Sequence, residues 1–75
     1  MTKKNELDIK NKIKVLRAEM DITQEGLAKA VGVTRATINA VEKCKYTPSL
    51  DLAFKLSIFF KTDIHNIFSI NDKDN

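Results

Sequence analysis

Cysteine, proline and glycine are scarce in this 75-residue chain, which contains one cysteine, one proline and two glycines. A single cysteine, Cys44, excludes an intramolecular disulfide and is typical of proteins in a reducing compartment. His65 is the one histidine, and no cluster of cysteine or acidic residues stands at metal-ligand spacing, so we expect no metal and no cofactor. A chain this short buries only about 60% of its unfolded surface. Oligomerisation is then the remaining source of added stability.

Long hydrophobic runs are absent as well. No apolar stretch approaches the roughly 18 residues of a membrane span, and the first residues are polar and lysine-containing without the apolar core of a signal peptide. We therefore expect a cytoplasmic protein with no membrane segment. The formal net charge of +3 permits a nucleic-acid partner but does not establish one. Glu42 is the only acid between residues 31 and 47, whereas residues 63–75 are net acidic, which indicates a local basic face.

Apolar residues at helical spacing predict five helices and no strand, and thus an all-α domain. The first helix should run from about Leu7 to Met20, because Ile9, Ile13, Leu16 and Met20 form one stripe. Good N-caps precede the next two helices, at Thr23 and Thr34, and Gly32 suits a left-handed C-cap between them. The fourth helix is expected from Pro48, with Thr47 as its cap, to about Lys61, and the fifth from Asp63 to Phe68, with Thr62 as its cap.

Two short helices joined by a tight glycine turn predict a helix-turn-helix over about residues 23–42. The residues that carry this prediction are Thr23-Gln24-Glu25-Gly26-Leu27-Ala28, Val31-Gly32-Val33-Thr34-Arg35, Ile38 and Glu42, with Leu16-Arg17 upstream and Tyr46-Thr47-Pro48-Ser49-Leu50 downstream. Over about residues 13–68 the chain resembles the Cro/CI-like (XRE) repressor family. The resemblance implies a five-helix lambda-repressor-like DNA-binding domain over residues 7–70. We expect a flexible basic arm at residues 1–6 and a disordered tail at residues 71–75.

The second helix of the motif has one face that can enter a major groove. Ile38 and Val41 should point inward. Arg35 can donate two hydrogen bonds to guanine, and Asn39 can pair similarly with adenine. The two alanines on this face either touch thymine methyl groups or merely permit close approach. The candidate base-reading residues are Thr34, Arg35, Ala36, Thr37, Asn39 and Ala40.

The resemblance also implies contacts to the DNA backbone, which position a protein without reading sequence. Gln24 lies at a helix N-terminus, where backbone N–H groups and the helix dipole suit a phosphate. The other candidate phosphate-binding residues follow the recognition helix, and they are Lys43, Lys45, Tyr46 and Thr47. Family members often pair an arginine with a glutamate at the positions of Arg17 and Glu42, so we expect a partly buried structural salt bridge.

Cys44 departs from the family pattern, which usually has glycine or asparagine at a position that often needs φ > 0. We therefore expect the loop geometry to differ. A thiol between two lysines could act as a redox sensor, or Cys44 is an incidental loop residue. His65 is expected at the surface.

The fourth helix is apolar almost all round, so a domain of this size cannot cover it alone. We place Leu50, Ala53, Leu56, Ser57 and Phe60 on its core face. The remaining apolar residues of the last two helices are candidates for a two-fold interface: Leu52, Phe54, Ile58, Phe59, Ile64, Ile67, Phe68 and Ile70. Alternatively, the C-terminal tail folds back over these residues in a monomer.

These observations predict a homodimeric transcriptional regulator, a repressor that binds an inverted-repeat operator in double-stranded DNA. No small-molecule ligand site is evident. An antitoxin or a restriction-modification controller of the same fold would also bind DNA and stays an alternative. A protein-interaction module that has lost DNA binding would have an acidic or bulky outward face on the third helix, and Arg35, Asn39, Lys43 and Lys45 argue against it. An enzyme is not expected, because no nucleophile is paired with a base.

Overall fold

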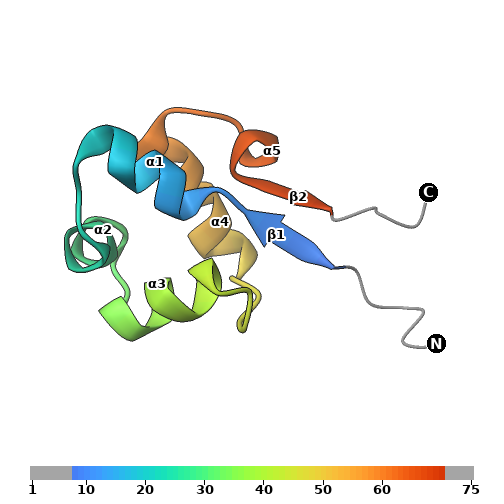
Figure 1. The fold of residues 1–75 in the computed structure, drawn as a ribbon, viewed down its shortest axis with the longest axis horizontal. Helices are drawn as coiled ribbons and strands as arrows, with labels where there is room; N and C mark the ends of the chain where they lie inside the picture. Colours follow the sequence, from blue (N-terminus) through green and yellow to red (C-terminus); the bar gives the residue numbers. More distant parts are fainter. Residues whose placement is uncertain (1–7, 71–75) are drawn as a thin grey trace.

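A computed structural model describes residues 8–70 of the chain. The predicted basic arm at 1–6 and the predicted disordered tail at 71–75 therefore lie outside the described residues. This part of the chain contains the five helices that the sequence predicts, and α2 packs against both α3 and α4 (Figure 1). None of the helices in residues 8–70 has the length and apolar character to cross a membrane. The helices are α1 (Ile13–Met20), α2 (Gln24–Val31), α3 (Arg35–Glu42), α4 (Leu50–Phe60) and α5 (Ile64–Ile67).

Two short strands are present, so the prediction of no strand is wrong. Strand β1 (Ile9–Asn11) pairs antiparallel with β2 (Phe68–Ile70), and Ile9 lies opposite Ile70. The backbone N–H of Lys12 extends the pairing with a 2.9 Å hydrogen bond to the carbonyl of Ile67. The resulting ribbon projects from the helices at one end of the molecule (Figure 1). It joins segments from near the two ends of the described chain.

Asn11 explains why α1 begins later than predicted. Its Oδ1 accepts a 3.1 Å hydrogen bond from the backbone N–H of Ile13, and its Nδ2 donates at 2.9 Å to the carbonyl of Val41. Asparagine side chains that bond to nearby backbone groups compete with helix formation in this way. Ile9 consequently lies in a strand, and Met20 is 49% exposed, so the predicted stripe contributes only its two middle residues to the core.

The starts of α4 and α5 also differ from the prediction. Ser49, and not Thr47, is the N-cap of α4, and its hydroxyl accepts a 3.0 Å hydrogen bond from the backbone N–H three residues later. Pro48 therefore precedes the cap instead of opening the helix. Asp63 occupies the N-cap position of α5, where Thr62 was expected. Serine and aspartate are as good at this position as threonine, so composition alone does not choose between neighbouring caps.

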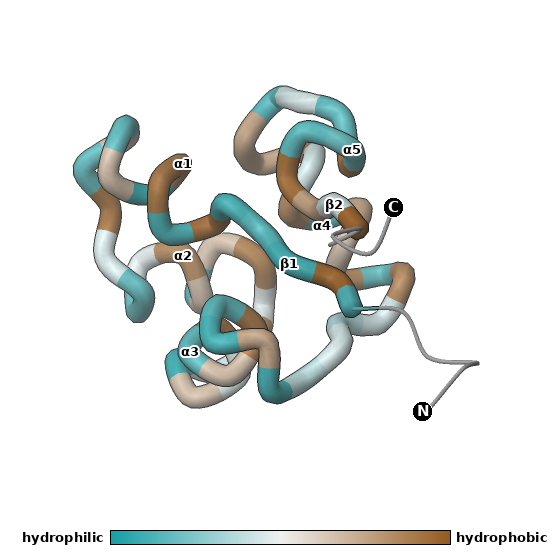
Figure 2. The backbone as a smooth tube through the Cα atoms, turned by 45° about the vertical axis from the view of Figure 1, so that its right-hand side comes forward, coloured by the Kyte–Doolittle hydropathy of each residue, from teal (hydrophilic) through white to brown (hydrophobic). Residues whose placement is uncertain are grey.

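The core combines residues from all five helices. Its buried members are Ile13, Leu27, Ala28, Val31, Ile38, Val41, Leu52, Leu56 and Ile67. Hydrophobic residues recur along α4, α5 and β2 (Figure 2). On α4, however, Leu50 is 70% exposed, so its placement in the core is wrong. It is the first residue of the helix and lies beyond the packed part of the core.

Candidate nucleic-acid interface

A sharp turn between α2 and α3 sets the direction of α3. Gly32 ends α2 with φ 79°, a left-handed conformation that glycine adopts without steric cost. The N–H of Val33 then donates at 3.0 Å to the carbonyl of Ala28, and Val33 packs against the core. The predicted N-caps are confirmed: the Thr23 hydroxyl accepts from a backbone N–H at 2.9 Å, and the Thr34 hydroxyl does so at 3.1 Å. Both helices of the motif thus start and stop at defined residues.

Helix α3 buries one side and leaves the other at the surface. Ile38 and Val41 are 0% and 1% exposed, because they pack into the core. Of the six candidate base-reading residues, the first three are exposed and the last three are half-buried, in the order Thr34, Arg35, Ala36, Thr37, Asn39 and Ala40. The hydroxyls of Thr34 and Thr37 lie 3.0 Å apart and share a hydrogen bond. The outward face is therefore small or polar, with Arg35 as its one charged side chain.

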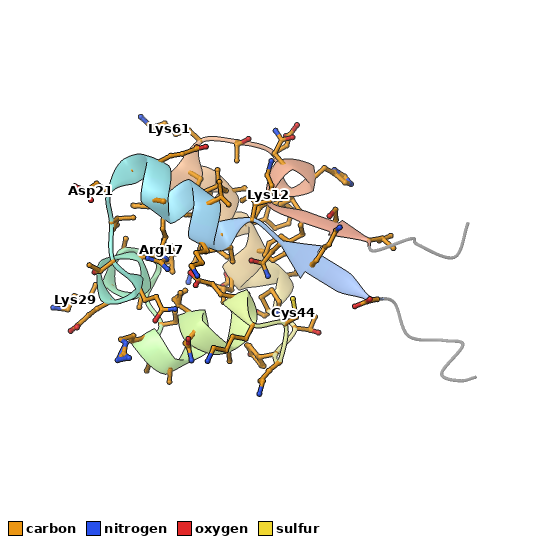
Figure 3. The ribbon with its side chains drawn as sticks, viewed as in Figure 1. Lys12, Arg17, Asp21, Lys29, Cys44 and Lys61 are labelled. Carbon is orange, nitrogen blue, oxygen red and sulfur yellow. The ribbon has the colours of Figure 1, made fainter. Side chains whose placement is uncertain are left out.

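An ion pair links α1 to the end of α3. Arg17 projects from α1 toward the place where α2 and α3 meet (Figure 3). Its Nε donates to Oε2 of Glu42 at 2.7 Å and its Nη2 donates to Oε1 at 3.2 Å, which makes a bidentate pair. Its Nη1 donates at 3.1 Å to the carbonyl of Ile22, between α1 and α2. One guanidinium thus connects α1, the segment between α1 and α2, and the end of α3.

The surroundings of this pair shift both pKa values. The side chains of Arg17 and Glu42 are only 15% and 7% exposed. Burial alone would raise the pKa of Glu42, but hydrogen bonds from Arg17 and Gln24, with the positive charges of Arg17 and Lys14, outweigh it and the pKa is lowered. The hydrogen bond to Glu42 raises the pKa of Arg17, against the effect of burial. Both groups are therefore held in their charged forms.

Gln24 has partners within the protein that the sequence does not indicate. Its Nε2 donates to Oε1 of Glu42 at 3.0 Å and to Oδ1 of Asn39 at 3.2 Å. The side-chain N–H groups of the expected phosphate ligand are thus used inside the motif. What remains toward solvent is the N-terminus of α2, whose first N–H groups have no partner within a helix. Only the crossing of α2 over α3 brings these side chains together, and no spacing in the chain signals it.

The loop after α3 is exposed throughout residues 43–47, so the structure places Lys43, Lys45, Tyr46 and Thr47 at the surface beside the recognition helix. The N–H of Lys45 donates at 2.9 Å to the carbonyl of Ala40, which satisfies one of the last carbonyls of the helix. Cys44 has φ 60°, the left-handed conformation that we expected a cysteine to avoid. The backbone of the loop therefore turns as a glycine would turn it.

Two residues that act near the end of α3, Asn11 and Lys14, were not identified from the sequence. Asn11 fastens β1 to α3 through its 2.9 Å hydrogen bond to the carbonyl of Val41, and its Nδ2 lies 3.9 Å from the sulfur of Cys44. Lys14 on α1 is exposed, and its charge acts on Glu42. Lys14 therefore adds positive charge close to the recognition helix. Its place in a lysine-rich segment of the sequence could have suggested this role.

The candidate interface residues do not share one environment. Leu52 and Ile67 are 4% and 1% exposed and belong to the core, so their assignment to an interface is wrong. Phe59 and Phe68 are half-buried and pack against the core, and Ile64 is half-buried. The strongly exposed members are Phe54, Ile58 and Ile70, at 52%, 73% and 55%. With Leu50, two of them form an apolar stripe at every fourth residue along α4.

Comparison with known proteins agrees with this geometry. A family profile described as Helix-turn-helix matches residues 13–66. The chain is 53% identical over 66 residues to an uncharacterized HTH-type transcriptional regulator of Methanocaldococcus jannaschii, covering 88% of this chain and 100% of that one. Identity to the uncharacterized HTH-type transcriptional regulator YgzD of Bacillus subtilis is 42% over the same shares of the two chains.

Two further similarities extend to a named repressor and to a crystal structure. The cryptic phage CTXphi transcriptional repressor RstR of Vibrio cholerae is 37% identical over 59 residues, which cover 79% of this chain and 53% of RstR. A crystal structure of a Bacteroides fragilis protein superposes with a TM-score of 0.72 at 31% identity, covering 81% of this chain and 98% of that one. The motif, its turn and these matches lead to one assignment: the chain belongs to the Cro/CI-like (XRE) family of helix-turn-helix transcriptional regulators.

Proposed function

We propose that this regulator binds a specific inverted-repeat operator in double-stranded DNA as a homodimer and acts as a repressor. The observation that carries the proposal is the outward face of α3. It bears small and polar side chains with one arginine, and its support is fixed by the Arg17–Glu42 pair. A major groove accepts a helix of this kind, and an acid on that face would oppose the phosphates. The repressor role is supported by the similarity to RstR.

Base reading is assigned to the exposed start of α3. Arg35 is exposed and stands in the first turn, the part of a recognition helix that contacts base edges. It lines a shallow surface depression together with Arg17, Thr23, Gln24 and Glu25. A guanidinium there can donate to O6 and N7 of a guanine. In this proposal the other residues of this face that approach the base edges are Thr34, Ala36 and Thr37.

Phosphate contacts are assigned to both sides of the recognition helix. On one side lies the N-terminus of α2, where the backbone at Gln24 offers N–H groups and the positive end of the helix dipole. On the other side lies the loop with Lys43 and Lys45, both exposed. Lys14 adds a further charge near the end of α3. Contacts on both flanks fix the position of the helix along its axis.

The two-fold interface is assigned to the exposed stripe on α4. Leu50, Phe54 and Ile58 are 70%, 52% and 73% exposed and share one side of the helix. Contiguous exposed apolar residues of this kind mark interaction surfaces. In a two-fold dimer the recognition helices would enter successive major grooves about 34 Å apart, which is why the operator would be an inverted repeat.

Selection of bound sequences from random duplex DNA tests the proposal, because a specific dimer returns an inverted repeat. Arg35→Ala should then weaken binding to the selected duplex by about 1–3 kcal/mol and relax one base pair in each half-site. Lys61→Asn, on a turn remote from α3 (Figure 3), is the matched loss of one positive charge. A selection without any consensus, or an Arg35→Ala protein with unchanged affinity and selectivity, would contradict base reading by α3.

The assignment of Lys45 to a phosphate predicts a different effect on DNA binding. Lys45→Ala should weaken all duplexes alike and reduce the slope of log affinity against log salt by about one, because one fewer counterion is released. Titrations at several salt concentrations, with selected and scrambled duplexes, measure both effects. A loss confined to the selected duplex would assign Lys45 to a base instead of a phosphate.

A further inference from the structure

Four polar side chains form a continuous chain across α1, α2 and α3. The guanidinium of Arg17 donates to Glu42, Gln24 donates to the same carboxylate at 3.0 Å, and Gln24 also donates to Asn39 at 3.2 Å. Glu42 is more enclosed than Arg17, with a side chain that is 7% exposed. Asn39, at the other end, is half-buried on the recognition helix.

The charged pair at one end of this series of side chains determines the direction of each hydrogen bond along it. A carboxylate can only accept, so Gln24 must turn its NH₂ group, and not its oxygen, toward Glu42. The second N–H of the same NH₂ group is then directed at Asn39, which must meet it with its oxygen. The amide orientations of glutamine and asparagine are usually ambiguous in a structure. Here the carboxylate of Glu42 fixes them both.

The orientation of Asn39 decides what it offers to DNA. Its Oδ1 accepts one hydrogen bond from Gln24, which orients the amide so that Nδ2 is directed away from Gln24, and the hydrogen bonds within residues 8–70 leave Nδ2 unused. Pairing with adenine in the major groove needs an amide that accepts from N6 and donates to N7. Guanine instead presents two acceptors, O6 and N7. An Asn39 amide that is fixed as a donor therefore matches guanine better than adenine, the base that the asparagine side chain by itself suggests.

We propose that Gln24 is a positioning residue that holds Asn39 as a hydrogen-bond donor, and that Asn39 thereby selects guanine over adenine at one base pair of each half-site. The inference rests on the proposed function, because it assumes that α3 lies in the major groove. It adds a specificity rule that neither residue carries alone. Arg17 and Glu42 take part only by fixing the direction of the Gln24 amide.

The test uses duplexes that differ at a single base pair. Asn39→Ala first identifies the pair, as the position in the selected operator at which base preference disappears. We expect the unaltered protein to bind the guanine duplex at least about fivefold more tightly than the adenine duplex at this position. Gln24→Met keeps the side-chain length but cannot donate, so the Asn39 amide is released and the ratio should fall toward one. Glu25→Met, at the exposed neighbouring residue, is the matched control and should keep the ratio.

The ratio separates positioning from a merely structural role, because loss of packing would weaken both duplexes equally. An unchanged ratio in Gln24→Met, or a preference of the unaltered protein for adenine, would overturn the inference while leaving DNA binding in place. Binding to no duplex would instead overturn the proposed function, and this inference with it. Thermal melting of each variant verifies folding, and Gln24→Ala replaces Gln24→Met if the latter is unfolded. In the free protein, exchange of the Gln24 side-chain N–H groups should be slower than that of Asn39, and the reverse order would also overturn the inference.

Discussion

Cys44 holds a backbone conformation that few side chains occupy. Its φ of 60° lies in the left-handed region, where a Cβ atom crowds the following carbonyl and costs roughly 1–2 kcal/mol. Asp21 and Lys61 adopt nearly the same φ at the ends of α1 and α4. Aspartate and asparagine tolerate this region through local hydrogen bonds, and cysteine does not. Strain in the loop beside the recognition helix is therefore concentrated at one residue.

Replacing Cys44 with glycine should stabilise the protein. Glycine removes the steric cost but adds unfolded-state entropy of about 0.5–1 kcal/mol, so we expect a net gain of about 0.5–1 kcal/mol in the free energy of unfolding. Urea denaturation at constant salt measures it. Cys44→Ser is the control, because it removes the thiol and keeps the Cβ. An equal gain in both variants would assign the effect to the thiol and not to the backbone.

At the scale of elements, the Arg17–Glu42 pair fixes α1 against α3 through two nearly buried side chains. Removing one partner of such a pair leaves an uncompensated charge. Arg17→Ala should therefore lower the free energy of unfolding by about 2–4 kcal/mol, somewhat less than for a fully enclosed pair.

The lowered pKa of Glu42 also makes stability depend on pH. The unfolded chain binds a proton on this residue at a higher pH than the folded chain does. The contribution of Glu42 is therefore complete above the ordinary glutamate pKa and is lost as pH falls through the lowered one.

Glu42→Gln should flatten this dependence. We expect the stability difference between the original protein and the variant to be largest near neutral pH and to shrink on acidification below about pH 4.5. Urea midpoints measured from pH 7 down to pH 3 give the comparison. Glu19→Gln, at an exposed acid on α1, is the matched control and should track the original protein. A difference that grows on acidification would contradict the pKa shift.

The elements differ in how far sequence can predict them. Helices α2 and α3 were predictable because their capping residues, Thr23, Gly32 and Thr34, form hydrogen bonds with residues only a few positions away in the sequence. The ribbon was not, since three-residue strands leave no period and β1 pairs with a strand far along the chain. The faces of α4 were partly misjudged, because a helix that is apolar almost all round does not indicate which side faces the core. Leu52 was therefore assigned to the two-fold interface and Leu50 to the core.

The candidate site shows the same division. The outward side of α3 follows from the inward positions of Ile38 and Val41, and the helical period alone gives it. The link from Gln24 to Asn39 depends on how two helices cross, which no local pattern specifies. Asn11 reaches α3 only because the ribbon places it there. Contacts that join distant segments were thus the part that required the structure.

At the scale of the whole molecule, as described over residues 8–70, the most exposed large hydrophobic residues are on α4, and others lie on α1, on the ribbon and in the loop after α3. Three apolar residues of α4 are more than half exposed, and Ile9 and Ile70 on the ribbon are 36% and 55% exposed. Helix α3, by contrast, exposes small and polar residues. In the proposed dimer the α4 stripe would contact the second copy and the outward face of α3 would contact DNA, so the two contacts would use different residues of the chain.

Ile58→Glu should shift the proposed dimer toward monomer, because it puts a charge into an apolar contact without touching the core. Sedimentation velocity over a concentration series measures the shift, and affinity for the selected inverted repeat should fall in parallel. Val15→Glu, at a residue 53% exposed on α1, is the matched control. A sedimentation profile identical to that of the original protein would rule out the α4 stripe as the interface.

The ribbon also has a consequence for the order of events during synthesis. Strand β1 leaves the ribosome well before β2, while α1 to α3 can form from contacts close in sequence. Closure of the ribbon must wait until the last helix has emerged, since it joins the most distant segments of the described chain. A chain terminated before Phe68 would therefore leave the backbone groups of β1 that face β2 without their partners. Unpaired strand groups can bond to another chain, so residues 68–70 should limit such association once they have paired with β1.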